Sequence, residues 1–429
     1  MLSRRGFIKG SGLALVGVGL MGGIPAFAAE AALSEKKNGR YKKNKILVCI
    51  FQRGAMDGLM AITPFTDTYL QTARPNLFLS AASNSLYGTT PLIDLDGRFG
   101  MHPMMKSFEP LYRDGRLAIV HGIGSPNNTR SHFDAQDYME SGTPFNKGTS
   151  SGWLNRAVGL LGHDQATPFQ AVSLTSALPR SFYGDYSCIA ISNLQDFTLQ
   201  LRGNPISINN AATSFEDLYD QTTPGLLRQT GKESFDALKL LKKSDIKNYQ
   251  PANQANYPNT AIGNALKQIA QLIKMDIGLE VAFAEHGGWD THYNQGNATG
   301  IFANNVADLS NSIAAFWTDL GAFQDDVTVM TMTEFGRTVH QNGTGGTDHG
   351  RASCNFILGN QVNGGKVHGS IQTLAVENLE DGRDLPVTTD FRTVFSEVAD
   401  LHLKISNDHI LFPDWSGKPI GVMKGQVIG

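Results

Sequence analysis

Residues 45–58 read KILVCIFQRGAMDG, an uninterrupted apolar run followed at once by a glycine-rich polar loop. A continuous apolar run of this length is typical of a strand that is covered on both faces of a parallel sheet. We therefore predict a buried strand over residues 45–51, with Arg53 and Asp57 in the loop beyond its carboxyl end. In doubly wound folds this is the end at which ligands bind.

Similar apolar runs recur along the chain and alternate with helical patterns. Strand–helix alternation predicts an α/β fold built on a doubly wound, mainly parallel sheet. The polar stretch at about 176–258 fits this alternation poorly, and we interpret it as an insertion that either caps the site or forms a surface excursion. The predicted strands are 117–121, 169–174, 279–284, 327–332 and 354–358, and the predicted helices are 131–141, 259–275, 303–323 and 389–403.

The first 28 residues carry the features of a signal for twin-arginine export. Arg4 and Arg5 are followed by Phe-Ile-Lys, then by a glycine-diluted apolar run over residues 13–24 and an Ala-Phe-Ala cleavage pattern that ends at Ala28. The apolar run is too short for a stable membrane span, which needs about 20 apolar residues. We predict a signal peptide over 1–28, a basic linker over 29–44 and one domain over 45–429. The expected partner is the twin-arginine translocation machinery, and the expected location is periplasmic or extracellular.

Composition excludes several classes of protein. The formal net charge of −3 and the absence of a basic-aromatic stripe argue against nucleic-acid binding. Three cysteines, an odd and sparse set, do not make a disulfide framework. The length of 429 residues exceeds the roughly 250–300 at which single cores stop growing, which suits one large α/β domain with an insertion or cap.

Acidic residues and histidines gather in the loops that follow the predicted strands, and such loops meet at one edge of a parallel sheet. Carboxylates combined with imidazoles suit Zn, Mn or Fe, whereas oxygen-only sites suit Ca or Mg. We predict one or two divalent metal ions. The candidate ligands are Asp57, Asp290, His292, Glu334, Asp348, His349 and His368.

Each candidate also has a plainer reading. Asp57 alone would cap a turn, and Glu334 with Arg337 would form a structural ion pair. The remaining histidines are scattered, and we interpret several of them as structural: His102, His121, His132, His163, His340, His402 and His409.

The segment 125–132, SPNNTRSH, contains the candidate nucleophiles. Ser131 has the position of a helix N-cap, where backbone N–H groups and the helix dipole favour anions. A hydroxyl of Ser131 or Thr129 beside a metal would suit covalent phosphoryl or sulfuryl transfer, and the alternative is that Ser131 is only a cap. The guanidinium groups of Arg53, Arg130 and Arg337 would clamp a tetrahedral oxyanion.

The motifs RGAMDGL, NTRSHFDAQD, GGWDTH, TEFGRT and GTDHGRA, together with the twin-arginine leader, resemble an exported bacterial family designated only as a domain of unknown function. That family is similar to the alkaline phosphatase/sulfatase superfamily. The resemblance implies an alkaline phosphatase/sulfatase-like fold. It also implies Asp57 as the first-strand ligand, Ser131 or Thr129 as the nucleophile, and three later ligand positions: Asp290 with His292, Asp348 with His349, and His368.

A competing alignment puts Glu334 at the position of the Asp-His pair and makes His349 the final histidine. The Cys-x-Pro-x-Arg signature of sulfatases is absent from the sequence. We therefore predict an exported metal-dependent hydrolase of a small-molecule or glycan phosphate or sulfate ester, with Ser131, Thr129 or a water molecule as the nucleophile. The alternative is a non-catalytic exported protein that keeps the hydrolase fold and binds a glycan, a metal or a protein partner.

Overall fold

The computed structural model describes residues 45–81, 90–162, 167–195 and 248–425. The predicted signal peptide, the basic linker and most of the predicted insertion, 196–247, lie outside the described residues. In the described part of the chain, no helix combines the length and the apolar character that crossing a bilayer requires. The three cysteines are all buried and form no disulfide.

A nine-stranded sheet forms the centre of the molecule, in the order β13-β5-β12-β9-β1-β8-β6-β7, with β14 paired to β5. The doubly wound, mainly parallel sheet predicted from the sequence is thereby confirmed. One difference concerns β12, which runs antiparallel to both of its neighbours. The strands are β1 (Ile46–Gln52), β5 (Leu117–Gly124), β6 (Ala171–Ser173), β7 (Ile189–Ala190), β8 (Val281–His286), β9 (Val327–Met332), β12 (Ser353–Leu358), β13 (Val367–His368) and β14 (Thr389–Asp390).

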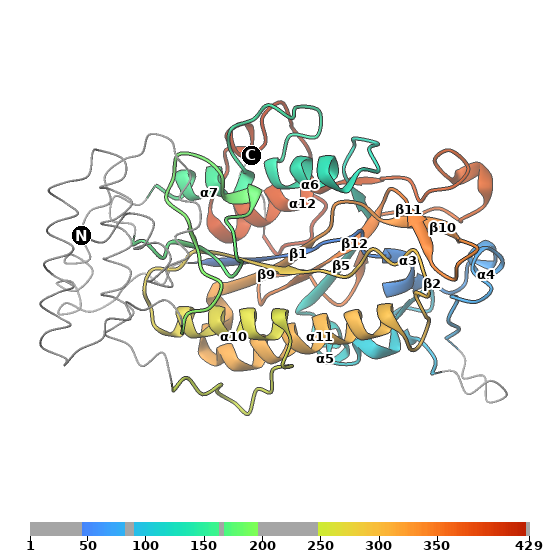
Figure 1. Ribbon diagram of the computed structural model, residues 1–429, viewed down its shortest axis with the longest axis horizontal. Coiled ribbons are helices and arrows are strands. Elements are labelled where there is room, and N and C mark those ends of the chain that lie inside the picture. The colour runs from blue at the N-terminus through green and yellow to red at the C-terminus, as the bar shows by residue number, and fades with distance from the viewer. Residues whose placement is uncertain (1–44, 82–89, 163–166, 196–247, 426–429) are drawn as a thin grey trace, which may run out of the picture.

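Helices cover both faces of this sheet (Figure 1). One layer contains α5 (Phe108–Arg113), α10 (Ala261–Lys274) and α11 (Ile301–Leu320), and the other contains α6 (His132–Ser141), α7 (Trp153–Leu161) and α12 (Phe391–Val398). Successive side chains of β1 alternate between the two layers because strand side chains point to opposite faces. Val48 and Ile50 pack with α10 and α11, whereas Leu47 and Cys49 pack with α7 and α12.

The predicted helices form with small shifts at their ends. Ser131 caps α6 by accepting a hydrogen bond from the Asp134 backbone N–H, the capping-box spacing expected from the sequence. The predicted helix at 389–403 is divided, because Thr389 and Asp390 form β14 and a π-helical turn, η6 (Ala399–Leu403), continues α12.

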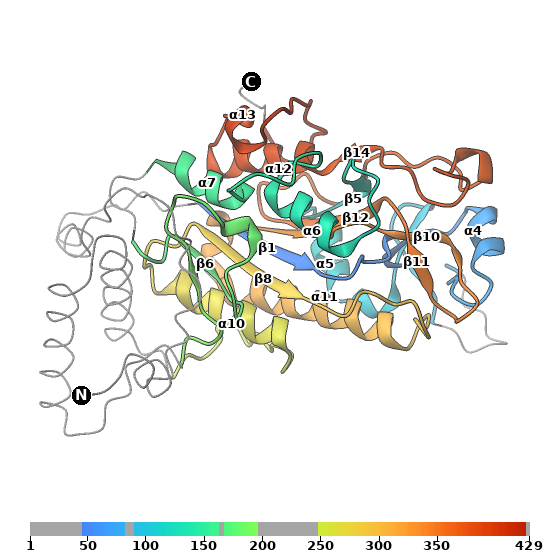
Figure 2. The same ribbon diagram turned by 45° about the horizontal axis from the view of Figure 1, so that its top comes forward.

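Smaller elements surround the carboxyl ends of the central strands. The β10–β11 hairpin lies beyond the carboxyl end of β1 (Figure 2), with Arg337 opposite His349 in its register. The elements at this end are α3 (Gly58–Ala61), α4 (Thr68–Ala73), a three-stranded sheet of β2 (Ile62–Pro64), β4 (Phe99–Met101) and β3 (Ile93–Asp94), and a two-stranded sheet of β10 (Arg337–Gln341) and β11 (Thr347–His349). The short helix α13 (Asp408–Leu411) lies elsewhere, beside α7.

Candidate metal centre

Three histidines from three different segments meet at the carboxyl edge of the sheet. His132 is the first residue of α6 and follows β5, His292 follows β8, and His349 ends β11. The strands β5, β8 and β9 all run in the same direction as β1, so the loops that follow them reach the same edge. The topology therefore brings together side chains that are more than 200 residues apart in sequence.

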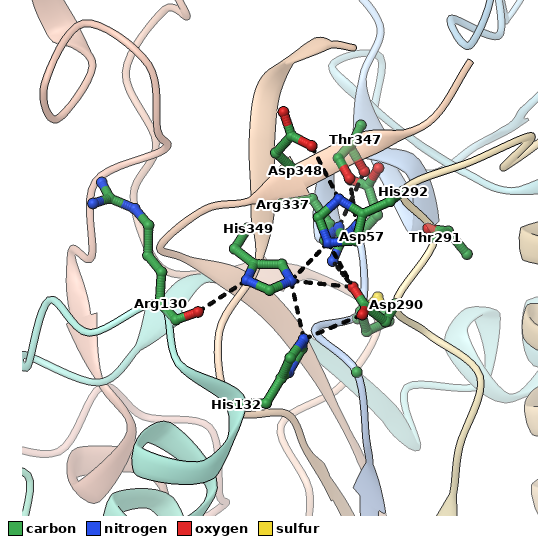
Figure 3. A network of polar contacts seen from close by, with 12 residues as sticks. Asp57, Arg130, His132, Asp290, Thr291, His292, Arg337, Thr347, Asp348 and His349 are labelled. Atoms are coloured by element: carbon green, nitrogen blue, oxygen red, sulfur yellow. Dashed lines mark hydrogen bonds and ion pairs between the residues drawn. The ribbon is translucent and has the colours of Figure 1, made fainter. Parts of the chain in front are cut away.

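The Nε2 atoms of these rings converge on one another and on a carboxylate. His349 Nε2 lies 3.0 Å from His132 Nε2 and 2.8 Å from His292 Nε2. The Asp290 carboxylate lies 3.5 Å from His132 Nε2, 3.1 Å from His292 Nε2 and 3.2 Å from His349 Nε2. Figure 3 shows His349 at the middle of these contacts. We refer to His132, Asp290, His292 and His349 as the imidazole cluster.

The other ring nitrogen of each histidine faces an oxygen acceptor. His132 Nδ1 lies 2.8 Å from Glu334 Oε1, and His292 Nδ1 lies 3.0 Å from Asp348 Oδ1. His349 Nδ1 lies 2.9 Å from the backbone carbonyl oxygen of Arg130. A carbonyl or an ionised carboxylate only accepts, so each Nδ1 carries the proton and donates it. In the neutral form of each ring, Nε2 therefore carries a lone pair.

This arrangement fits a metal ion. The Nε2 lone pairs of His132 and His349 and the Asp290 carboxylate face the same small volume, which one cation could share, and His292 Nε2 lies beside His349 and Asp290. Ligands placed about 2.0–2.1 Å from Zn²⁺ in a tetrahedral site are separated from each other by roughly 3.3 Å. The contacts in the imidazole cluster, 2.8–3.5 Å, bracket that value. The ligand atoms of His132, Asp290 and His349 all lie within 4.8 Å of one another.

Charges around the imidazole cluster shift its pKa values in opposite directions. The hydrogen bond to Glu334 raises the pKa of His132, whereas burial lowers the pKa of His349. Burial alone would raise the pKa of Asp290, but the hydrogen bond and charge of Arg337 outweigh it and lower the pKa. Without a cation, His132 is therefore the ring best able to hold the extra proton that relieves the repulsion among the lone pairs.

Glu334 lies beneath the imidazole cluster and is fully buried. Its Oε1 accepts from His132 Nδ1, from the Gly54 backbone N–H at 2.9 Å and from Gln136 Nε2 at 2.9 Å. Burial alone would raise the pKa of Glu334, but these hydrogen bonds lower it and keep the group ionised. A carboxylate that holds the far nitrogen of a ligating histidine is the usual outer-shell partner in metal sites.

The candidate carboxylates take different places. Asp290 belongs to the imidazole cluster. Asp348 and Glu334 accept hydrogen bonds from the Nδ1 atoms of His292 and His132, respectively. Asp57 forms an ion pair with Arg74 at 2.8 Å. His368 lies on β13, where its Nε2 faces the Asn363 carbonyl at 2.8 Å. It is not one of the four residues of the imidazole cluster.

All three arginines predicted to clamp an oxyanion are engaged in ion pairs. Arg337 donates to Asp290 at 2.8 Å, and Arg53 contacts Glu285 at 2.6 Å and Glu140 at 2.9 Å. Arg130 contacts Asp384, which is buried, and Asp381. Each arginine thus stabilises a loop of the site.

The two candidate hydroxyls lie at the start of α6. Ser131 is exposed and caps the helix, and its backbone N–H donates to Thr129 Oγ1 at 3.2 Å. Because His132 is the next residue, the N-terminus of α6 lies beside the imidazole cluster. That position places a hydroxyl and the positive end of a helix dipole next to the candidate metal ligands.

Sequence reasoning missed four residues of the site. His132 was grouped with the scattered histidines, although it directly follows the predicted cap Ser131 and so stands at a helix start beyond a strand. Gln136, one helical turn later, joins Arg53 to Glu334 through hydrogen bonds of 3.0 and 2.9 Å. The other two residues, Arg74 and Gln295, contact Asp57 and have no signal in the sequence.

Comparison with solved structures finds remote likenesses. The C-terminal periplasmic domain of EcEptC from Escherichia coli, in complex with Zn, is 10% identical with a TM-score of 0.36, over 79% of this chain and 77% of that one. An alkaline phosphatase from the Antarctic bacterium TAB5 is 13% identical with a TM-score of 0.30, over 75% and 93%. The PsFucS1 sulfatase from Pseudoalteromonas sp. is 12% identical with a TM-score of 0.30, over 78% and 66%. Superpositions this loose do not transfer a function.

Comparison of sequences identifies a family. No curated protein matches the chain. The family described as a protein of unknown function, DUF1501, matches residues 117–411, which is well over half of the chain and includes all four residues of the imidazole cluster. The chain therefore belongs to the DUF1501 family.

Proposed function

We propose that the imidazole cluster binds a divalent transition-metal ion, and that the protein is an exported metal-dependent hydrolase of a phosphate or sulfate ester. One observation carries the proposal: the Nε2 atoms of His132, His292 and His349 each lie within 3.5 Å of the Asp290 carboxylate, while each Nδ1 faces an oxygen acceptor. Packing four electron-rich groups together is unfavourable unless a cation joins them.

The donor set favours some metals over others. Imidazole nitrogens with one carboxylate suit Zn, Mn or Fe, whereas Ca and Mg prefer oxygen ligands. A bound ion of this kind supplies Lewis-acid chemistry, polarising an ester oxygen and favouring attack by a hydroxyl or water. Zinc is the first ion to test, because the contacts in the imidazole cluster bracket its tetrahedral ligand spacing.

The protein's own groups would then orient the reactants. Arg337 fixes Asp290, Glu334 fixes His132, and the exposed Ser131 hydroxyl stands one residue from His132. The N-terminus of α6 favours an anionic group nearby. The phosphate or sulfate ester itself is the substrate class that the motif resemblance implies, with Ser131, Thr129 or water as the nucleophile.

A second candidate function is metal or ligand binding without catalysis. One observation favours it: Arg53, Arg130 and Arg337 are all held in ion pairs, so none of these three stands ready to clamp an oxyanion. Such a protein would keep the metal centre and bind a glycan or a protein partner through it.

Export through the twin-arginine machinery to the periplasm or the cell exterior is part of the proposal and is supported by the leader sequence. Arg4 and Arg5 precede an apolar run and an Ala-x-Ala site. Because the twin-arginine route carries folded proteins, the metal would be loaded before translocation.

The test is metal analysis of the mature chain, purified after native export without chelator, combined with hydrolysis assays on aryl phosphate and aryl sulfate esters. His349→Asn should lose the metal and any hydrolysis while keeping its circular dichroism spectrum. His340→Asn, which replaces an exposed histidine on β10, is the matched control and should keep both.

Two outcomes would redirect the proposal. A folded wild-type protein that takes up no Zn, Mn or Fe after reconstitution would end the metal-centre hypothesis. Metal bound at the imidazole cluster with no cleavage of either ester class would favour the binding function.

A further inference from the structure

Both carboxylate oxygens of Asp57 are already engaged by hydrogen-bond donors. Its Oδ1 accepts from the Met60 backbone N–H at 3.2 Å and from Arg74 Nη1 at 3.0 Å. Its Oδ2 accepts from Arg74 Nη1 at 2.8 Å and from Gln295 Nε2 at 2.7 Å. An ionised carboxylate offers about four lone-pair sites, and three donor groups here make four contacts with them, two on each oxygen. An ion would have to displace a donor from a carboxylate that is 1% exposed.

Arg74 is a cation fixed in place beside this carboxylate. Its Nε donates to the Val339 carbonyl at 2.8 Å and its Nη2 donates to the Thr338 carbonyl at 2.7 Å, both on β10. The side chain is 3% exposed. A guanidinium stays charged at every pH that a protein experiences, so a permanent positive charge lies in contact with Asp57. A second cation at this carboxylate would be repelled at close range.

A chain of hydrogen bonds connects Asp57 to the imidazole cluster. Gln295 donates to Asp57 through Nε2, and its Oε1 accepts from Thr347 Oγ1 at 2.7 Å. Thr347 Oγ1 in turn accepts from Arg337 Nε at 3.2 Å, and Arg337 Nη1 donates to Asp290 at 2.8 Å. Figure 3 draws Asp57, Thr347, Arg337 and Asp290 as members of one network of polar contacts.

We infer that Arg74 occupies the charge position of a second metal ion, so that the centre binds a single ion and Asp57 is a positioning residue. This inference rests on the proposed metal centre. Asp57 acts on the ligand Asp290 through Gln295, which connects to it by way of Thr347 and Arg337 and also contacts the neighbouring Thr291, and it acts on the β10–β11 hairpin through Arg74. The loops after β1 and β8 and the hairpin are thereby joined at one buried carboxylate.

The decisive experiment counts metal ions per chain in the full-length wild-type protein by elemental analysis after saturation with Zn²⁺ and gel filtration. About one equivalent supports the inference, since the imidazole cluster supplies one set of ligands. Two equivalents would overturn it while leaving the metal centre intact. No metal in the folded protein would overturn the proposed function itself, so the two failures are distinguished by the count.

Variants test the positioning role. Asp57→Asn should still bind about one equivalent of Zn²⁺ per chain, because Asp57 is not a ligand. Loss of a full equivalent of Zn²⁺ from the folded variant would show that Asp57 is a metal ligand. Since Asp57→Asn leaves a buried guanidinium without its counter-charge, Gln295→Leu is the second variant. It breaks the connection and keeps the ion pair.

Gln295→Leu should retain one equivalent but raise the dissociation constant for Zn²⁺ by about 10-fold, the lower end of outer-shell effects. Gln372→Leu, at an exposed position, is the control and should not change it. An unchanged dissociation constant in Gln295→Leu would show that the hydrogen-bond chain does not position Asp290.

Discussion

His132 and His349 approach each other through Nε2 atoms 3.0 Å apart, while the Nδ1 atom of each ring is engaged with an oxygen acceptor. Two neutral rings oriented in this way present lone pair to lone pair. A direct N–H···N bond between them requires a second proton on one ring, and Glu334 favours His132 for it by raising its pKa. The same geometry accepts a metal ion in place of that proton.

Glu334→Gln should weaken zinc binding without abolishing it. The amide keeps the shape of the side chain but removes the negative charge that holds His132 Nδ1–H. Loss of an outer-shell partner of this kind raises the dissociation constant for the metal by about 10–100-fold, or roughly 1.4–2.7 kcal/mol. Competition with a chromophoric chelator measures the change. Glu377→Gln, at an exposed glutamate, should bind zinc like the wild type. Equal affinities of all three proteins would contradict the role given to Glu334.

Gly54→Ala should destabilise the protein, because a side chain does not fit there. Gly54 has φ +116°, and an added Cβ would lie 2.6 Å from the Asp290 backbone nitrogen. Its own N–H donates to Glu334. Backbone strain costs about 1–3 kcal/mol and the clash adds to it, so we expect the free energy of unfolding to fall by about 3 kcal/mol or more.

The control for this prediction is Gly287→Ala in the loop after β8, where an added Cβ meets no atom within 4 Å. This substitution should change the free energy of unfolding by less than about 0.5 kcal/mol. Urea denaturation of both variants gives the comparison. Similar stabilities for the two variants would mean that the loop carrying Asp290 moves freely away from Gly54.

The sequence predicts the sheet well because buried strands have a local signal. The run at 327–332 becomes β9 with the same ends, and the run at 45–51 becomes β1 with a shift of one residue. The direction of β12 has no such signal. An apolar strand buried on both faces reads the same whether it runs parallel or antiparallel, so only the path of the chain decides.

The site is predicted only in part, because a ligand's role depends on distant partners. Asp290 and His292 were visible as a pair with spacing of two after a strand. His132 is a single histidine at the start of a helix, and no spacing to a second ligand-type residue marks it as a metal ligand. Whether Asp57 binds a metal or an arginine depends on Arg74, which is the C-cap residue of helix α4 and lies 17 residues away in the sequence. No local pattern connects these two residues.

Changing both leader arginines should stop export. In Arg4→Lys/Arg5→Lys the charge is kept, but the address read by the translocation receptor is altered. On the proposed export route, we expect the uncleaved variant to remain in the cytoplasmic fraction, and the wild type to be recovered outside it with its leader removed near Ala28. Fractionation and mass spectrometry distinguish these forms. Lys36→Arg/Lys37→Arg in the basic linker is the control, and processed Arg4→Lys/Arg5→Lys protein outside the cytoplasm would exclude the twin-arginine route.

Acid should destabilise the fold through its buried histidines, of which His402 is the clearest. Its Nε2 donates to the Ile46 carbonyl at 2.9 Å, and its Nδ1 faces Thr328 Oγ1 at 3.1 Å. Burial lowers the pKa of His402 to about 4, whereas the unfolded chain titrates near 6.5. Between these values the unfolded state binds the extra proton. The contribution to stability is therefore fully present above pH 6.5 and is lost as the pH falls toward 4, by about 3 kcal/mol in total.

His402→Gln removes this titration while its amide can still donate to Ile46 and accept from Thr328. The free energy of unfolding, measured by urea denaturation at pH 7, 6 and 5, should fall less steeply for His402→Gln than for the wild type. The difference in slope should approach one proton, because a single group is removed. His409→Gln, at an exposed histidine, is the control and should follow the wild-type slope. Parallel slopes for wild type and His402→Gln would mean that His402 takes up its proton in the folded state at an ordinary pKa.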